Sequence, residues 1–195
     1  MDANELAALI RDLASADAAT RSRAAACIFR SGADTAQRAT MNWLENRELR
    51  QLFLSDQYGL VTTVGVAVGQ DAFEAIRQAN GSPGLADVPP DQDAMEFELE
   101  FGRGVRLDVL TSREPSANGA IARFLKKLGE GIQQIEFEVR DVRRVTDILQ
   151  KQLGIQPIYP AARDGADGTR VNFFLVTDPQ SRRVLVELVQ SASTP

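Results

Sequence analysis

Carboxylates and an amide alternate with apolar residues in the segment 129–139, and these side chains can move protons or bind a hard cation. In a strand, Gln134, Glu136 and Glu138 share one face, and apolar side chains occupy the other. Like charges on one face raise one another's pKa values, so a carboxyl group there can act as a general acid or base. The chain has no histidine, which excludes imidazole metal ligands, serine–histidine triads and a histidine base.

The composition excludes several classes of partner. The 195 residues carry a formal net charge of −5 and no run rich in lysine or arginine, which argues against a nucleic-acid surface. Cys27 is the only cysteine, so no internal disulfide can form, and we expect a reducing, cytoplasmic compartment. Its place in a helical pattern indicates burial rather than reactivity. No segment has the apolar length of a signal-peptide core or a membrane span, so we expect no membrane association.

Residues 1–56 have the apolar spacing of helices and almost no strand signal. Asp2 and Glu5 form a capping-box pattern, and a second helix over 18–29 is expected to stop at Gly32. A third helix is expected to open at Asp34, with a short fourth before residue 54. These helices predict an all-α appendage packed on the main domain, or alternatively a protein-interaction module.

From about residue 60 the apolar period changes from 3.6 to 2, so we place a domain boundary at 55–59 and a domain over 60–190. Helices are expected from Asp71, over 121–128 and from Asp141. Strands are predicted over 61–68, 95–101, 105–110, 132–139, 169–176 and 183–189. The order of a strand, a helix and then two or three strands thus occurs twice, over about 60–112 and 130–190. This duplication predicts an α+β fold.

Several short motifs resemble one known family. They are Val64-Gly-Val-Ala-Val68, Gly129-Glu-Gly-Ile-Gln-Gln-Ile135, Gly168-Thr-Arg-Val-Asn-Phe173 and Val184-Leu-Val-Glu-Leu188. Together they resemble methylmalonyl-CoA epimerase, a family of the glyoxalase, or vicinal-oxygen-chelate, superfamily. The resemblance implies paired βαβββ modules, the glyoxalase/bleomycin-resistance fold, whose sheets curl round a cavity. Separately, the pattern Asp17…Arg21…Ala24-Ala25…Phe29…Gly32 is similar to a HEAT-type helical repeat.

The family resemblance also implies a site. Its members hold a divalent metal with four side chains from four strands, typically histidine, glutamine, histidine and glutamate. Carried over by motif, these positions are Thr63, Asp108, Gln134 and Glu187, so both histidines are lost and only the glutamate is retained in kind. Strand alternation independently places all four on polar strand faces, from which they could point into one cavity.

The four residue types change the expected metal chemistry. Thr63 and Gln134 supply neutral oxygens, which weakens the preference for cobalt, nickel or zinc. We therefore expect a metal-free site, with an oxygen-ligated magnesium, manganese or calcium ion as the alternative. In the epimerase reaction that the resemblance implies, removal of the proton next to the thioester carbonyl leaves an enolate. Without a metal, this enolate loses its main electrostatic stabiliser.

Further polar residues are expected near this site. Glu187 and Glu136 are the candidate catalytic carboxylates, and Arg106, Arg170 and Asn172 are candidate cavity residues that could pair with the acids. The alternative is that these arginines and acids form a filled, structural interior. The acidic strand 96–100 is interpreted as a solvated face.

Three functions remain open at this point. The first is a metal-independent small-molecule binding protein, as the bleomycin-resistance members of the superfamily are. The second is an isomerase or lyase of epimerase type, and the third is a protein-interaction module that uses the N-terminal helices. A homodimer is a further possibility for the assembly. Because one scaffold hosts all these functions, the fold alone does not choose between them.

Overall fold

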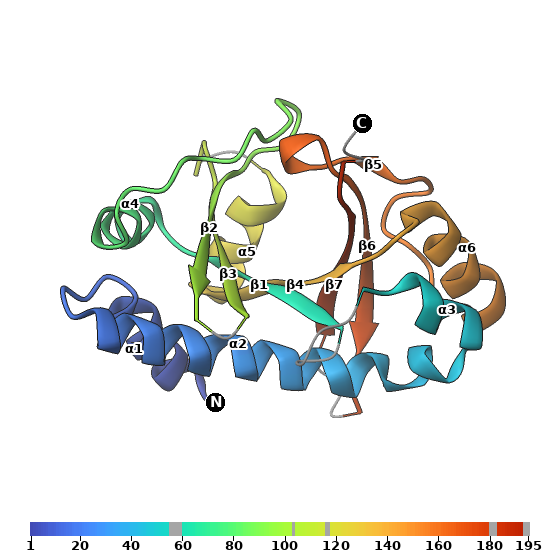
Figure 1. Cartoon of the computed structure of the whole chain (residues 1–195). Coiled ribbons are helices and arrows are strands. Elements are labelled where there is room, and N and C mark those ends of the chain that lie inside the picture. The colour runs from blue at the N-terminus through green and yellow to red at the C-terminus, as the bar shows by residue number, and fades with distance from the viewer. Residues whose placement is uncertain (55–59, 103, 116–117, 180–182, 193–195) are drawn as a thin grey trace. The chain divides into compact units, whose positions relative to one another are not determined.

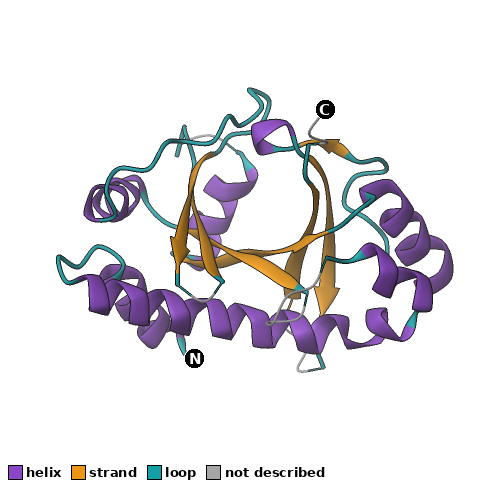
Figure 2. Cartoon of the chain, viewed as in Figure 1, coloured by secondary structure: helices purple, strands orange, loops and turns teal. Residues whose placement is uncertain are grey.

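The computed structural model describes residues 1–54, 60–102, 104–115, 118–179 and 183–192 (Figure 1). The chain divides into two compact units, Met1–Gly32 with Thr63–Gln133, and Ala33–Thr62 with Gln134–Pro195. Each unit combines helices with strands (Figure 2).

The first unit begins with α1 (Ala3–Asp12), and the capping box predicted from the sequence is confirmed. The Asp2 carboxylate accepts hydrogen bonds from the backbone N–H groups of Asn4 (2.8 Å) and Glu5 (2.9 Å). In return, the Glu5 carboxylate accepts one from the Asp2 N–H at 2.9 Å. These bonds satisfy backbone donors that have no partner within the helix.

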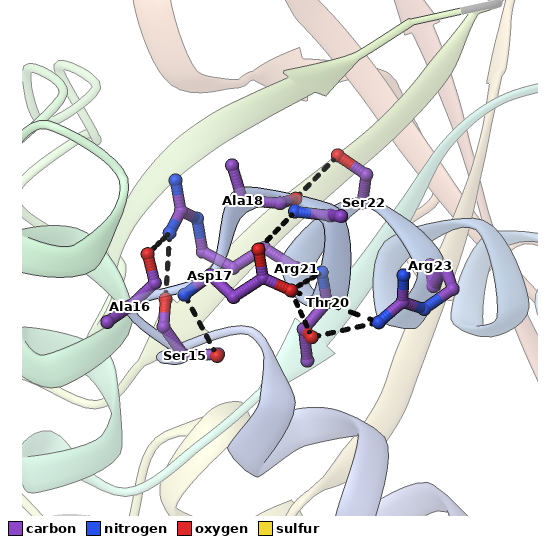
Figure 3. Close-up of polar contacts among 9 residues, drawn as sticks. Ser15, Ala16, Asp17, Ala18, Thr20, Arg21, Ser22 and Arg23 are labelled. Carbon is purple, nitrogen blue, oxygen red and sulfur yellow. Dashed lines mark hydrogen bonds and ion pairs between the residues drawn. The ribbon is translucent and has the colours of Figure 1, made fainter.

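The turn between α1 and α2 (Ala18–Thr40) is held by Asp17 and Arg21 (Figure 3). The Asp17 carboxylate accepts hydrogen bonds from the hydroxyl and the backbone N–H of Thr20, at 2.6 and 3.0 Å, and the hydroxyl contact is the main reason that its pKa is lowered. The Arg21 guanidinium donates to the carbonyl oxygens of Ser15 (2.7 Å) and Ala16 (3.1 Å). The turn is therefore fixed from both of its ends.

Asn80, the C-cap of α4 (Gln70–Ala79), connects this turn to the rest of the first unit. Its Oδ1 accepts a hydrogen bond from Arg21 Nε at 3.1 Å, and its Nδ2 donates to the carbonyl oxygens of Leu13 (3.0 Å) and Ile76 (2.8 Å). One amide thus contacts α2, the end of α1 and the last turn of α4.

The strands of the first unit have the order β2-β3-β1, from β1 (Val61–Ala67, of which Thr63–Ala67 belong to this unit), β2 (Met95–Phe101) and β3 (Val105–Thr111). β1 and β3 are parallel, and β2 and β3 are antiparallel. Phe73 of α4 packs against Phe97 of β2 with a centroid distance of 4.7 Å, so α4 covers the face that carries Phe97, Leu107 and Val109. Helix α5 (Ala120–Leu128) follows β3 along the chain.

The second unit repeats this topology. Its strands have the order β4-β7-β6-β5, from β4 (Gly131–Glu138, of which Gln134–Glu138 belong to this unit), β5 (Arg163–Asp164), β6 (Arg170–Thr177) and β7 (Arg183–Gln190). β4 and β7 are parallel, and the other two pairs are antiparallel. The crossover helix α6 (Val142–Leu153) is capped by Asp141, whose carboxylate accepts from the Arg144 N–H, as the sequence predicts. The short helix η2 (Ala166–Gly168) lies between β5 and β6.

Residues 33–54 belong to the core of the second unit. Trp43 of η1 (Met41–Glu45) is fully buried, 5.9 Å from Phe137 of β4 and 6.2 Å from Phe174 of β6 between ring centroids. Phe53, after α3 (Arg47–Leu52), also contacts Trp43 and Phe137 and forms a bridge with Val139. The two aromatic residues from the N-terminal region therefore complete the packing of β4 and β6.

The α+β fold and the duplicated order of elements are confirmed, and each predicted strand matches an observed one to within one or two residues. The short strand β5 was not predicted. Two predictions about helices are wrong. Gly32 does not end a helix, because α2 continues to Thr40 and includes Asp34. Cys27 is exposed rather than buried, since it lies opposite the buried Ala24, Ala25 and Ile28 on the amphipathic helix α2.

The boundary predicted at 55–59 lies outside the described residues, as does Arg103 in the predicted turn between β2 and β3. The helical extension over 1–56 as a separate domain, the domain over 60–190 and the HEAT-like character of the helices stay predictions.

Candidate functional site

The second unit brings Gln134, Glu136 and Glu187 together on one face of its sheet. In the parallel pairing of β4 with β7, Glu136 lies opposite Glu187, and Gln134 is two residues before Glu136 on the same face. Gln134 and Glu187 are 7% and 8% exposed, so both residues are largely buried. The opposite face of the same strands carries Phe137 and Leu188, which belong to the core.

The amide of Gln134 bridges the two carboxylates. Gln134 Nε2 lies 2.6 Å from Glu187 Oε2 and 3.3 Å from Glu136 Oε1. Only the NH₂ end of the amide can face two carboxylates, because the amide oxygen would be repelled by them. A neutral double donor therefore stands between the acids, and both of its N–H groups are directed to carboxylate oxygens.

Two further hydrogen bonds involve β4, the strand that carries Gln134 and Glu136. The hydroxyl of Thr62 donates to the carbonyl oxygen of Glu136 at 3.1 Å. Farther along β4, the Glu138 carboxylate accepts a hydrogen bond from the Ser191 hydroxyl at 2.6 Å. Glu138 thus shares the face of Glu136 but has a different partner.

Asn172 and Arg170 lie on the other face of β6. The antiparallel register pairs Phe173, not Asn172, with Glu187. Asn172 is fully buried towards α6 and donates to the Thr146 hydroxyl (3.4 Å) and the Tyr159 carbonyl oxygen (3.3 Å). Arg170 forms an ion pair with Asp164 and donates to the Ala162 carbonyl oxygen at 2.5 Å. The structure therefore does not bring these two residues to the Glu187 side of the sheet.

In the first unit, Thr63, Arg106 and Asp108 share one face. Asp108 pairs with Gly65 in the parallel β1–β3 register, and Thr63 is two residues before Gly65. Thr63 and Asp108 are buried at 3% and 9% exposure, whereas Arg106 is exposed.

The acidic strand β2 contributes to this same face. The register places Glu98 opposite Asp108 and Glu100 opposite Arg106. Glu98 and Glu100 are exposed, as the sequence predicts, but their place beside Asp108 was not predicted. The signal was present in the chain, because β2 ends at Phe101 and β3 begins at Val105, and so short a connection limits the register of the pair.

The pKa of Glu98 is raised above its ordinary value. Partial burial of the carboxyl group is the main cause, although part of the side chain is exposed, and the neighbouring Glu100 adds to it. The Arg106 guanidinium acts in the opposite direction. Glu98, which lies on the same sheet face as Asp108, therefore loses its proton at a higher pH than an ordinary glutamate.

The candidate site residues do not suit the divalent metal ion that the family resemblance implies. No three histidine, cysteine, aspartate or glutamate side chains come together in the described ranges as ligands for an ion. In the second unit the position between the carboxylates is taken by the N–H groups of Gln134, which are donors and repel a cation. The donor set therefore differs in kind from that of a metal-binding relative.

Comparisons with solved structures agree with the fold. The methylmalonyl-CoA epimerase from Mycobacterium tuberculosis is 32% identical, over 68% of this chain and 90% of that one, with a TM-score of 0.55. A hypothetical protein from Bacillus halodurans is 25% identical, over 69% and 96%, with a TM-score of 0.55. A Streptomyces coelicolor methylmalonyl-CoA epimerase variant, in complex with 2-nitronate-propionyl-CoA, is 25% identical over 68% and 97%, with a TM-score of 0.53.

No protein-family model and no curated protein matches the chain. Within the described ranges, every helix is too short or too polar to cross a membrane. The chain reproduces nine-tenths of the Mycobacterium tuberculosis enzyme at 32% identity, and its repeated strand–helix–strand order is the one the resemblance implied. It therefore belongs to the methylmalonyl-CoA epimerase family of the glyoxalase, or vicinal-oxygen-chelate, superfamily.

Proposed function

We propose that this chain is a metal-independent binding protein for a small thioester of the acyl-CoA type. The observation that carries the proposal is the Gln134 amide, 2.6 Å from the buried Glu187 and also in contact with Glu136. The thioester class is suggested by relatives whose structures hold methylmalonyl-CoA or 2-nitronate-propionyl-CoA.

The charges on the sheet face of Gln134, Glu136 and Glu187 favour ligand binding over catalysis of proton transfer. Abstraction of a proton beside a thioester carbonyl places negative charge on the carbonyl oxygen, which needs donors or a cation to stabilise it. Both N–H groups of Gln134 are directed to carboxylates, and Glu136 and Glu187 would repel the developing charge. The same carboxylates can accept hydrogen bonds from hydroxyl or amide N–H groups of a ligand.

An epimerase-type isomerase or lyase is the second candidate, and the 32% identity to a methylmalonyl-CoA epimerase favours it. Glu187 or Glu136 would then be the base. That reaction would need electrostatic stabilisation, for example by a magnesium, manganese or calcium ion, which the arrangement of Gln134 does not fit. A partner protein for the N-terminal helices stays a third candidate.

Calorimetry with the full chain tests the proposal. We expect methylmalonyl-CoA or propionyl-CoA to bind equally well before and after treatment with EDTA. Glu187→Gln should weaken binding about tenfold, because it removes the charged member of the buried hydrogen bond. Glu45→Gln, an exposed change in the same unit, is the matched control. If neither thioester binds, the proposed function is wrong.

Exchange of the α-proton of methylmalonyl-CoA in deuterated water separates the two candidates. The binding protein should show no exchange above the uncatalysed rate, with or without added magnesium, manganese, calcium or cobalt. Exchange that depends on an ion and is lost in Glu187→Gln would instead establish the epimerase function.

A further inference from the structure

The first unit contains two asparagines that are each followed by glycine, in the pairs Asn80-Gly81 and Asn118-Gly119. Asparagine loses its side-chain amide most readily in this dipeptide, because glycine has no side chain to hinder its backbone nitrogen. The reaction requires the asparagine side chain to turn towards that nitrogen. Its rate in a folded chain therefore depends on how the asparagine amide is held.

The structure favours glycine at both positions. Gly81 follows the C-cap of α4 with a φ of 83°, in the left-handed region that residues with a Cβ rarely adopt. A Cβ added to Gly119 would lie 2.4 Å from the Oδ2 atom of Asp93, so this carboxylate packs directly against Gly119. The carboxylate is itself held, since it accepts hydrogen bonds from the Ser112 hydroxyl at 2.6 Å and from the Glu114 N–H at 3.1 Å. A larger residue at either position would be strained or would displace its neighbour.

Hydrogen bonds hold both ends of the Asn80 side-chain amide. Its Oδ1 accepts from Arg21 Nε at 3.1 Å, and its Nδ2 donates to the carbonyl oxygens of Leu13 (3.0 Å) and Ile76 (2.8 Å). The Gly81 N–H, which belongs to the attacking nitrogen, donates to a carbonyl oxygen in the last turn of α4 at 3.3 Å. Reaction at Asn80 would therefore require these contacts to break first.

Asn118, between β3 and α5, has a different environment. It is exposed, and its side-chain amide forms no hydrogen bond with the described ranges of the chain. The Arg123 guanidinium donates to the backbone carbonyl oxygen of Asn118, a contact that does not involve the side chain. The Asn118 side chain can thus turn towards the Gly119 nitrogen without the loss of such a bond.

We propose that Asn118 is a site of spontaneous deamidation in the folded protein, whereas the hydrogen bonds of Asn80 protect the other pair. In this reaction the Gly119 nitrogen bonds to Cγ of Asn118, and the bond from Cγ to the amide nitrogen breaks. The proton lost by the Gly119 nitrogen passes through solvent to the departing nitrogen, which leaves as ammonia. Water then opens the cyclic succinimide at either carbonyl carbon and gives aspartate or isoaspartate.

The two sites differ in what the reaction would change. At Asn118 it adds a carboxylate next to Gly119, against which Asp93 packs, and it makes the formal net charge of −5 more negative by one. At Asn80 it would replace two donated hydrogen bonds by contacts between a carboxylate and carbonyl oxygens. The protected asparagine is thus the one whose amide connects α1, α2 and α4.

Mass spectrometry of the full chain, incubated at mildly alkaline pH, tests the proposal. Trypsin places the two pairs in separate peptides, 78–103 and 114–123, and each peptide is measured for replacement of an amide by an acid and for isoaspartate. A sample digested before incubation gives the background. We expect Asn118 to react about tenfold faster than Asn80 or more, since hydrogen bonds must be lost before Asn80 can react. Asn42, an exposed asparagine followed by Trp43, is the control and should stay unmodified.

Two perturbations test the protection of Asn80. Arg21→Gln removes one hydrogen bond of the Asn80 amide and should raise the rate at Asn80 about fivefold, with the rate at Asn118 unchanged. Urea below the unfolding transition should have the same effect without a substitution, because a reaction of the open form follows the population of that form. Arg30→Gln, an exposed change on the same helix, is the matched control.

Two results would overturn the proposal. If Asn118 reacts no faster than Asn42, it is not a deamidation site of the folded protein. If Asn80 reacts as fast as Asn118, or if neither Arg21→Gln nor urea accelerates it, its hydrogen bonds do not protect it. A fast reaction at Asn118, together with a slow reaction at Asn80 that both perturbations accelerate, establishes the proposal.

Discussion

Gln134 lies between Glu136 and Glu187, where an amide and a carboxylate would have opposite effects. The amide supplies two donors to the acids and so stabilises their charged forms without a cation. A third carboxylate would supply none and would add repulsion, but it would also complete a set of oxygen ligands that a hard cation prefers. The identity of this one side chain thus determines whether the second unit is suited to a metal.

Gln134→Glu should convert the second unit into a metal-responsive site. In EDTA we expect the variant to be less stable than the wild type by about 1–3 kcal/mol, because a buried hydrogen bond is replaced by like-charge repulsion. Magnesium, manganese or calcium should raise its melting temperature, since an ion that binds only the folded state stabilises it. Thermal melts with each ion measure this. The melting temperature of Gln134→Leu should not change with any ion. If no ion raises the melting temperature of Gln134→Glu, the role given to the amide is wrong.

Glu98→Gln should change the pH dependence of stability. Since the pKa of Glu98 is raised in the folded state, its favourable contribution is complete below the ordinary pKa of glutamate and is lost as pH rises through the raised value. The wild type should therefore be less stable than Glu98→Gln at pH 7, and the difference should vanish near pH 3. Urea unfolding at a series of pH values measures the difference. An equal difference at all pH values would show that ionisation of Glu98 is not its cause.

At the scale of elements, the hairpin between β5 and β6 is held by Arg170 and contains a closely packed glycine. Arg170 holds this segment from one face, while Arg163 lies on the other. Gly165 occupies a tight place in it, because a Cβ added there would lie 2.5 Å from the Thr169 hydroxyl oxygen and 2.6 Å from Val171 Cγ1. A side chain at that position would therefore force Thr169 and Val171 to move.

Gly165→Ala should destabilise the chain by about 1–3 kcal/mol, the usual cost of forcing an extra carbon into a packed site. Chemical unfolding measures this effect. Gly84→Ala is the control, since an added Cβ there meets no atom within 4 Å. Unchanged stability of Gly165→Ala would contradict the observed packing.

At the scale of the molecule, both units repeat one topology, and the N-terminal region contributes to each. α1 and the first part of α2 belong to the first unit, and residues 33–54 supply Trp43 and Phe53 to the second. Glu48 of α3 and Arg144 of α6 form an ion pair at 2.5 Å within the second unit. Residues 33–54 therefore act as part of a core, whatever else the helices bind.

Trp43→Ala should destabilise the second unit by about 3–5 kcal/mol, the usual cost of removing a buried aromatic side chain. The loss should appear as a lower midpoint in chemical unfolding followed by circular dichroism. Leu44→Ala, the neighbouring change at a position that is 39% exposed, should cost less than about 1 kcal/mol. Equal effects of the two substitutions would show that Trp43 is not a core residue.

Alternation of apolar and polar residues determined the strands, the duplicated order and the polar character of Gln134, Glu136 and Glu187, because side-chain direction along a strand is a local property. It could not choose the core-facing side of β6, since Val171, Phe173 and Leu175 form a uniformly apolar side, whereas the side that carries Asn172 and Phe174 is the one that faces the core. Pairing with β7 made that choice and directed Asn172 into the core.

Tertiary contacts also decided the remaining features. Gly32 is a helix-stop signal in isolation, yet α2 passes through it, because one glycine costs a helix only ~1 kcal/mol and packing of the flanking turns exceeds that. The hydrogen bond from Gln134 to Glu187 joins residues that are 53 positions apart in the chain. Such contacts depend on strand register, which is set by long-range pairing and not by any local pattern.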